Sequence, residues 1–484
     1  MLTFASSQLS WLAALAVIGT HLALGADEFP VVARVLCTVP ALIMIVEARG
    51  YLRKTSNELP FIVLAMLQFY IAFGFPVLFD FRFFDFKGPV FFTEGTRIEA
   101  SIAVALGSLG VWGGARAGYL LGPGIARFAT KGLPPEVTGR GWDQAFYIYA
   151  AATVLMSLLI TFSLSVVPVQ IQLAVFVIFQ LEFLLGIAMV KGPQSLGPRL
   201  SWAILAFSAL IGMARGQMEP IFRSGMAFVA ARWVTLRRIP VLGIALVIVL
   251  FTILQPVKHY YRYEVWTREA HTGQSSNVSE RVTAWQNAFA NASASESQKT
   301  GSEASAVERL CELNPMMHAM TMVPRQIPYL YGQSFVEVLY SFIPRLLWPN
   351  KPTSVEGISQ RYAVIFGLQS ERAAQSTAVG MNLLVEGYWN FGWFGVILLC
   401  FAEGLVVGAS QSALCGGHWA LRAIGIAQIA TLTVNSTVVL LYSSLFQATV
   451  GRLLIVWGLY WMARMLSGRA RSGRGAVTRR LARR

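Results

Sequence analysis

The chain has 484 residues, of which 55% are hydrophobic and only 13% are charged, with a mean hydropathy of +0.56. Soluble domains carry roughly 25% charged residues, so this composition excludes an ordinary soluble protein and indicates a membrane protein. The net charge of +15 does not indicate nucleic-acid binding, because the basic residues lie in short segments between apolar runs and in the C-terminal tail.

Apolar runs of about 20 residues, the length that crosses a bilayer, recur along the chain. They predict about a dozen spans, near 9–26, 29–47, 61–79, 98–120, 143–163, 167–190, 200–216, 218–235, 239–256, 384–410, 419–440 and 443–465. The first run has no basic segment before it, so we interpret it as a span and not as a cleaved signal. The expected fold class is an all-α, polytopic integral membrane protein.

Basic residues in the short loops predict the orientation. They follow every second span, and the tail from Arg464 to Arg484 holds eight Arg and no acid. Both termini are then cytoplasmic, and one long loop faces the other side. The predicted parts are a bundle of about nine spans (1–256), the external loop (257–383), three C-terminal spans (384–465) and a basic cytoplasmic tail (466–484).

The external loop has its own structural signals. Residues 278–289 and 304–322 have helical patterns, and Pro315 is expected to interrupt the second. From Lys258 to Arg372 the loop carries eleven basic and ten acidic residues, so it is not simply a cationic patch. Cys311 is its only cysteine, and no CxxC spacing occurs, so neither a disulfide nor a metal site is expected.

Two groups of cations stand beside aromatic residues. Lys258 and Arg262 flank three amphipathic rings at the exit of the ninth span, where they could bind phosphate groups or form an aromatic belt with snorkelling cations. Three prolines stiffen residues 342–352 and present Arg345 and Lys351 beside Trp348. The second arrangement suits an anionic or sugar ligand and equally suits a surface turn with an aromatic anchor.

Several ionisable residues are candidates for chemistry. Glu386 opens the tenth span, where a carboxylate is costly unless it is paired or faces water, although an ordinary helix start favours it too. A single histidine such as His318 is more often a satisfied core residue than a catalyst. Glu182 and Arg116 lie in or near spans and could be functional groups or structural ion pairs.

The order of these features resembles the bacterial O-antigen and oligosaccharide repeat-unit polymerases, the Wzy-type membrane glycosyltransferases. The resemblance covers roughly 255–395. It is carried by Lys258 and Arg262, Arg309, Tyr331-Gly332, the motif PRxLWPxKP at 344–352 and the motif EGYxNFG at 386–392.

This resemblance implies a GT-C-like fold without a cofactor or a metal ion. Such enzymes transfer a lipid-linked glycan to an acceptor hydroxyl at the outer face of the inner membrane, and the lipid diphosphate leaves. Fixed cations must then neutralise the leaving group, and a carboxylate or a histidine must accept the hydroxyl proton. The expected partners are polyprenyl-diphosphate-linked glycans and membrane lipid, with a chain-length regulator and a flippase as candidate protein partners.

The resemblance also implies roles for individual residues. Glu386 is the preferred general base and His318 the reserve, with Arg345 as the third catalytic residue. The expected diphosphate and sugar contacts are Lys258, Arg262, Arg309, Arg345, Lys351, Arg215, Trp348, Tyr388 and Asn390.

Three rival interpretations remain open. An O-antigen ligase would share the topology and the chemistry but use another acceptor. A secondary transporter would use Glu182 and Arg116, and a structural assembly factor of the envelope would use neither set.

Overall fold

In the computed structural model, the described residues are 2–53, 59–79, 83–85, 88–134, 136–162, 179–192, 197–215, 219–236, 278–294, 311–336, 348, 361–371, 380–414, 417–432 and 448–481, with single positions between 243 and 268. The chain divides into two compact units. The first takes in Met1–Ile125, Ala304–Cys415 and Thr431–Gln447, and the second takes in Ala126–Glu303, Gly416–Ala430 and Ala448–Arg484. Each unit therefore joins segments that are far apart in the sequence.

The described residues are helical almost throughout, which confirms the predicted all-α class. Within them, five helices are long and apolar enough to cross a membrane: Val31–Tyr51, Phe61–Leu78, Glu94–Ala129, Arg140–Thr161 and Leu383–Leu414. Three shorter apolar helices, Ser10–Leu24, Arg199–Ala214 and Trp419–Ile429, fall on three more of the predicted spans. Among the described residues, one antiparallel pair interrupts the helical pattern, β1 (Phe83–Asp85) with β2 (Gly88–Val90).

The first unit combines N-terminal helices with part of the predicted loop. Its elements are α1 (Leu2–Leu24), α2 (Val31–Leu36), α3 (Val39–Arg53), α4 (Phe61–Phe69), the π-helical turn η1 (Tyr70–Gly74), the 3-10 turn η2 (Phe75–Leu78), α5 (Glu94–Ala129), α13 (Leu313–Met322), the 3-10 turn η5 (Gln333–Phe335) and α17 (Leu383–Leu414). One apolar cluster contains Phe69 and Val104 together with Met316, Phe366 and Trp389. This part of the loop is therefore built into the helical core.

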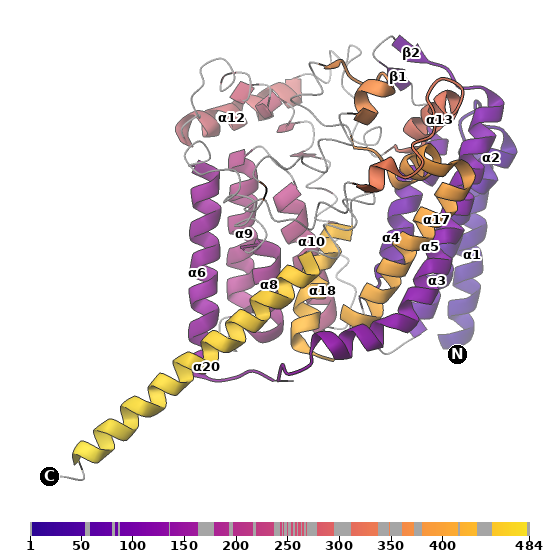
Figure 1. Ribbon diagram of the computed structural model, residues 1–484. Helices are drawn as coiled ribbons and strands as arrows, with labels where there is room; N and C mark the ends of the chain where they lie inside the picture. The colour runs from indigo at the N-terminus through magenta and orange to yellow at the C-terminus, as the bar shows by residue number, and fades with distance from the viewer. Residues whose placement is uncertain are drawn as a thin grey trace. The chain divides into compact units, whose positions relative to one another are not determined.

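Helices α5 and α17 lie side by side in the first unit (Figure 1). A Cβ added at Gly118 of α5 would clash with the carbonyl oxygen of Leu405, and one added at Gly408 of α17 would clash with that of Ala115. Because no side chain separates them here, the two backbones approach closely, as small residues allow for helices in lipid. This packing fixes the second half of α17.

The second unit is a separate group of helices. Its elements are α6 (Arg140–Phe162), α8 (Leu181–Lys191), α9 (Gly197–Arg215), α10 (Glu219–Leu236), α12 (Val278–Ala294), α18 (Trp419–Leu432) and α20 (Ala448–Leu481). Arg452 of α20 is 1% exposed and donates hydrogen bonds to Gln180 Oε1 at 2.9 Å and to Gln428 Oε1 at 2.5 Å. A charge is costly inside a helical bundle, so these two glutamines are important for keeping Arg452 there.

The predicted loop helix at 278–289 is confirmed as α12, which belongs to the second unit. Trp285 Nε1 donates to Met213 O at 2.8 Å, and Tyr261 OH donates to Ala214 O at 3.0 Å. The rings of Tyr261 and Trp285 stack at 4.5 Å. These side chains satisfy carbonyl groups at the end of α9 that have no partner within the helix.

The second predicted loop helix differs from expectation. α13 begins at Leu313, so Pro315 lies in its first turn, where a helix needs no N–H donor, and does not interrupt it. Residues 304–310 lie outside the described residues, as do parts of the spans predicted at 167–190, 239–256, 419–440 and 443–465.

Candidate functional site

Helix α17 is broken near its start, within the EGYxNFG motif. Phe391 (φ −141°, ψ 20°) and Gly392 (φ 60°, ψ −140°) leave the helical conformation. Glycine adopts a positive φ readily, so Gly392 makes this break possible. Across the break, a Cβ added at Gly387 would lie 2.7 Å from the Gly395 carbonyl oxygen. The glycines of the motif therefore allow α17 to fold closely on itself.

Glu386 lies on the first turn of α17 and is fully buried. Its Oε1 accepts a hydrogen bond of 2.8 Å from Ser334 Oγ, which accepts one of 2.9 Å from Asn390 Nδ2. Asn390 Nδ2 also donates to Glu386 O at 2.8 Å. A buried carboxylate needs polar partners, so Ser334 and Asn390 help to hold Glu386 in one position.

The turn before Ser334 is attached to the same break. Leu330 N donates to Trp389 O at 2.9 Å, and Tyr331 N donates to Asn390 O at 3.2 Å. Gly332 N donates to the Asn390 side-chain oxygen at 2.9 Å. Asn390 therefore joins the loop to the broken helix through both its backbone and its amide.

His318 of α13 is buried and is held in one orientation. Its Nε2 lies 2.8 Å from the Phe366 carbonyl oxygen. Because a carbonyl oxygen can only accept, Nε2 donates the proton in this hydrogen bond, so a neutral ring would have its lone pair on Nδ1. Nδ1 has no hydrogen-bond partner within the described structure, and Phe83 of β1 lies 5.4 Å from the imidazole ring. The result is an oriented imidazole whose Nδ1 is unpaired within the part of the chain that the structure describes.

Phe366 is the centre of a group of buried polar side chains. Its ring lies 5.0 Å from Tyr362, 4.9 Å from Trp389 and 6.3 Å from His318. Tyr362 OH and Trp389 Nε1, like His318 Nδ1, form no hydrogen bond within the described residues. Such atoms are rare in proteins and cost roughly 1–3 kcal/mol each, so three around one ring mark this place as a candidate site.

Glu312 connects three segments at the start of α13. Its N–H donates to Ala72 O in η1 at 2.8 Å, and its Oε2 accepts from Asn382 Nδ2 at 3.0 Å. Asn382 in turn caps α17, because its Oδ1 accepts from Val385 N at 2.9 Å. Burial raises the pKa of Glu312 to about 7, and the Asn382 hydrogen bond opposes this shift only in part.

Tyr362 adds a second titratable group near Glu312. Burial and the negative charge of Glu312 both raise the pKa of the Tyr362 phenol, so the phenol stays neutral. The Phe366 group therefore offers a neutral hydroxyl, an indole N–H and a basic nitrogen, a mixed set of donors and acceptors that suits hydroxyl groups of a ligand.

The structure places the predicted site residues in different parts of the molecule. His318, Glu386 and Asn390 take part in the contacts above, and Tyr388 is buried edge-on against Trp393 at 5.9 Å. Trp348 of the first unit is 39% exposed.

The predicted diphosphate contacts are distributed differently. Lys258 and Arg262 are half-buried residues of the second unit, and Arg215 ends α9 of that unit. Arg309, Arg345 and Lys351 lie outside the described residues. The roles of these six cations stay predictions.

The residues of the transporter interpretation have partners. Arg116 forms an ion pair of 2.5 Å with Glu47, and Trp112 Nε1 donates to the same oxygen at 2.6 Å. Glu182 is buried in the second unit and is a charged neighbour of Arg452. Arg116 therefore belongs to a structural ion pair, whereas Glu182 belongs to a buried polar group.

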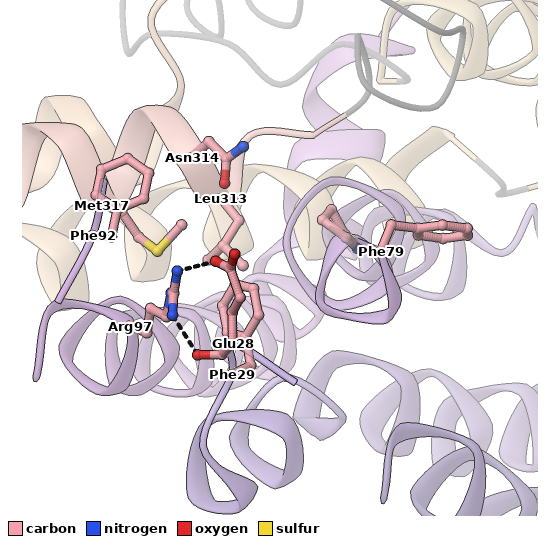
Figure 2. Close-up of a pocket in the computed structure, with 9 residues that line it drawn as sticks. Glu28, Phe29, Phe79, Phe92, Arg97, Leu313, Asn314 and Met317 are labelled. Carbon is pink, nitrogen blue, oxygen red and sulfur yellow. Dashed lines mark hydrogen bonds and ion pairs between the residues drawn. The ribbon is translucent and has the colours of Figure 1, made fainter. Parts of the chain in front are cut away.

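A small cavity of about 20 Å³ in the first unit is shown in Figure 2. Arg97 of α5 donates to the carboxylate and to the backbone carbonyl of Glu28, and Leu313 and Met317 of α13 also line the cavity. This volume holds about one water molecule. The cavity is therefore a small packing gap where these segments meet, and it is too small to be a substrate pocket. A hollow of about 500 Å³ in the second unit is lined by Pro134, Glu136, Val137, Thr138, Trp142, Tyr460, Ala463, Arg464 and Ser467.

Sequence reasoning missed Glu312, Ser334 and Tyr362. Glu312 stands directly before a helix with proline in its first turn, and Ser334 follows the Tyr331-Gly332 pair, so their positions were informative. Tyr362 carries no comparable signal. Among the described residues, no three His, Cys, Asp or Glu side chains are grouped so that they could hold a metal ion.

Residues 138–421 match the family DUF8712, which is described as a domain of unknown function. The match covers more than half of the chain, so the protein belongs to this family. Every residue of the predicted glycosyltransferase site lies within the matched region, whereas Arg116, Arg452 and the pair of Arg97 with Glu28 lie outside it. No curated protein and no solved structure matches the chain.

Proposed function

We propose that this DUF8712 protein is a membrane glycosyltransferase that polymerises polyprenyl-diphosphate-linked oligosaccharide repeat units into a cell-surface polysaccharide. The motifs of residues 255–395 and the apolar helices support this class. The proposal includes about a dozen spans in the bacterial inner membrane, both termini in the cytoplasm and the loop on the outer side.

One observation carries the proposal. Three buried polar atoms without partners in the described structure, on His318, Tyr362 and Trp389, surround Phe366, and Trp389 belongs to the EGYxNFG motif. Unpaired buried groups of this kind are costly, and a catalytic role is one of the explanations for keeping them. Their position, where a loop segment meets the start of α17, is the region in which the resemblance places the chemistry.

The proposed step is a single glycosyl transfer. The acceptor hydroxyl oxygen forms a bond to the anomeric carbon of the donor, the bond from that carbon to the lipid diphosphate breaks, and the hydroxyl proton passes to a base. The diphosphate leaves with the electron pair, so cations must stabilise it. Arg309 and Arg345, with support from Lys351, are proposed for that role, and the phosphate contacts of Lys258 and Arg262 in the second unit stay predictions.

His318 fits the role of the base better than Glu386. The Phe366 carbonyl orients the imidazole, and Nδ1 has no partner among the described residues, which is the arrangement of a general base held by a third group. Glu386 already accepts a hydrogen bond from Ser334. We therefore assign Glu386 to organising the site electrostatically and His318 to proton transfer.

The test is chain extension in vitro by the purified full-length protein, with a lipid-diphosphate-linked oligosaccharide as the substrate. The wild type should yield products of two or more repeat units, and Arg345→Ala and Glu386→Gln should abolish them while expression is retained. Near-normal product from both variants would overturn the assignment, and no product from the wild type would overturn the polymerase.

Two alternatives can be separated in related assays. A ligase would transfer a finished glycan to a different acceptor, so product from that acceptor alone would favour it. A secondary transporter is favoured by one observation, the buried Arg452 with Glu182 as its neighbour. In that case Glu182→Gln and Arg452→Gln would impair the cell more than His318→Gln.

A further inference from the structure

Tyr331 adopts an unusual backbone conformation for a residue with a large side chain. Its φ is +48°, and within the described residues no other non-glycine residue has a positive φ. This left-handed region is costly for residues that carry a Cβ, and glycine or asparagine adopts it more readily. Strained residues of this kind cluster at functional sites, and they persist where the surrounding structure holds them firmly.

Hydrogen bonds on both sides of Tyr331 keep its backbone in this conformation. Three consecutive N–H groups, those of Leu330, Tyr331 and Gly332, donate to Trp389 and Asn390 at the break in α17. The conformation is therefore imposed by the broken helix. It directs the Tyr331 side chain outward, where it is 74% exposed.

Other rings continue from Tyr331 along the break. Tyr329 lies 6.0 Å from Tyr331, and its hydroxyl would be 3.1 Å from a Cβ added at Gly392. The ring of Tyr388 lies 5.9 Å from that of Trp393, and the electrostatic neighbours of Tyr388 are Tyr329, Glu99 and Arg325. We name Tyr329, Tyr331, Tyr388 and Trp393 the aromatic rim.

An aromatic belt at the membrane surface is the simpler explanation of exposed rings. A belt residue needs only an exposed position on a regular helix, as Phe394 has with 67% exposure. It gains nothing from a strained backbone. The strain at Tyr331 therefore indicates that the direction of this one ring matters.

We propose that Tyr331 stacks on a sugar ring of the lipid-linked glycan and that the aromatic rim is a glycan-binding subsite. A sugar ring has an apolar C–H face that packs on an aromatic ring, and its hydroxyl groups can bond to the phenols of Tyr329 and Tyr331 and to the exposed Arg325. Tyrosine supplies a large rigid surface with a polar tip, which suits such a ligand. The inference rests on the proposed function, because it takes a glycan as the substrate.

The test measures binding to the full-length protein in nanodiscs by native mass spectrometry. Two probes are used: the lipid-linked oligosaccharide extracted from cells that lack this protein, and polyprenyl diphosphate without sugar. Tyr331→Asn removes the ring and suits the left-handed backbone. It should weaken glycan-lipid binding at least tenfold, leave polyprenyl diphosphate binding unchanged, and leave thermal stability equal or higher. Tyr331→Phe should keep glycan binding within threefold.

Phe394→Asn is the matched control, because it removes an exposed ring from a regular part of α17. It should leave the ratio of the two affinities unchanged. Equal losses for both probes in Tyr331→Asn would make the ring a membrane anchor, and unchanged glycan binding would also overturn the proposal. If the wild type binds the glycan lipid selectively through Tyr331 but extends no chain, the proposed glycan-binding subsite is supported and the proposed polymerase function is overturned.

Discussion

The two halves of α17 perform different tasks within one helix. Before the break at Phe391 and Gly392, Glu386 and Asn390 form buried polar contacts with a loop segment. After the break, Gly408 meets α5 backbone to backbone. The second half therefore fixes the helix in place, and the first half presents polar groups. A rigid support of this kind is what a precisely positioned site requires.

This comparison has a physical basis. Close packing of small residues is a favourable way for helices to associate in lipid, but it leaves no room for functional side chains. Buried polar groups need partners, and those partners come from segments such as 311–336 that pack on the start of α17. Substitutions in the first half should therefore change activity, and those in the second half should change stability.

After Arg345→Ala and Glu386→Gln, the largest expected effect is that of His318→Gln. It removes the proposed base, so chain extension in vitro should fall at least about 100-fold, while the unfolding temperature in detergent should change little. The control is His418→Gln in the second unit, because His418 also places an imidazole nitrogen 3.1 Å from a backbone carbonyl, that of Pro134. The control should retain activity within a few-fold.

Comparison with Glu386→Gln sharpens this prediction. If His318→Gln remains active while Glu386→Gln is inactive, the base is Glu386, and the orientation of His318 is structural. If both lose activity while His418→Gln does not, both His318 and Glu386 are needed for chain extension, as the proposal requires.

The next effect concerns Asn390, which joins the loop to the break. Asn390→Ala leaves Gly332 N without an acceptor and removes the hydrogen bond that Ser334 Oγ accepts, so the free energy of unfolding should fall by roughly 3 kcal/mol. Unfolding by SDS from mild detergent micelles measures this change. Gln333→Ala, at an exposed position in the same turn, should have almost no effect. An equal loss of unfolding free energy in both variants would show that the Asn390 hydrogen bonds do not stabilise the attachment of the loop.

Composition and periodicity predicted the helical class and α12, because burial in lipid demands long apolar runs whatever their partners are. The motif at 386–392 also led to Glu386 and Asn390. Sequence reasoning took Asn390 for a sugar contact, however, whereas its amide is buried and bonded to Gly332, Ser334 and Glu386.

Other features could not be predicted from one sequence, because they depend on contacts between distant segments. Glu312 acquires its raised pKa only when it is buried beside Asn382, 70 positions along the chain. The left-handed conformation of Tyr331 is likewise imposed by hydrogen bonds to Trp389 and Asn390. The conformational propensities of neighbouring residues in the sequence predict neither the raised pKa of Glu312 nor the backbone conformation of Tyr331.

Glu312, which bonds to the cap residue of α17, should make the stability of the folded protein depend on pH. Its pKa rises from the ordinary 4.5 to about 7 in the folded protein. Between these values the folded state holds a proton that the unfolded chain has lost, so stability is greatest below pH 4.5 and falls as the pH rises towards 7. The total loss is roughly 3 kcal/mol at most. Glu312→Gln mimics the protonated form and should remove this dependence.

The measurement is the unfolding temperature in detergent between pH 5 and pH 8. The wild type should lose stability across this interval, and Glu312→Gln should be the more stable protein at pH 8. Glu371→Gln, at an exposed carboxylate of the first unit, should follow the wild type. Parallel pH profiles for all three proteins would contradict a buried, neutral Glu312.

The smallest expected effect concerns the second half of α17 and its contact with α5. Gly118→Ala places a Cβ against the Leu405 carbonyl, so the helices must separate slightly, and the free energy of unfolding should fall by roughly 2 kcal/mol. Gly124→Ala is the matched control, because no atom lies within 4 Å of a Cβ there. It should be neutral or should stabilise α5 by up to about 1 kcal/mol. At a temperature where both variants are folded, Gly118→Ala should extend chains at the wild-type rate. A loss of activity without a loss of stability would mean that the second half of α17 also contributes to the chemistry.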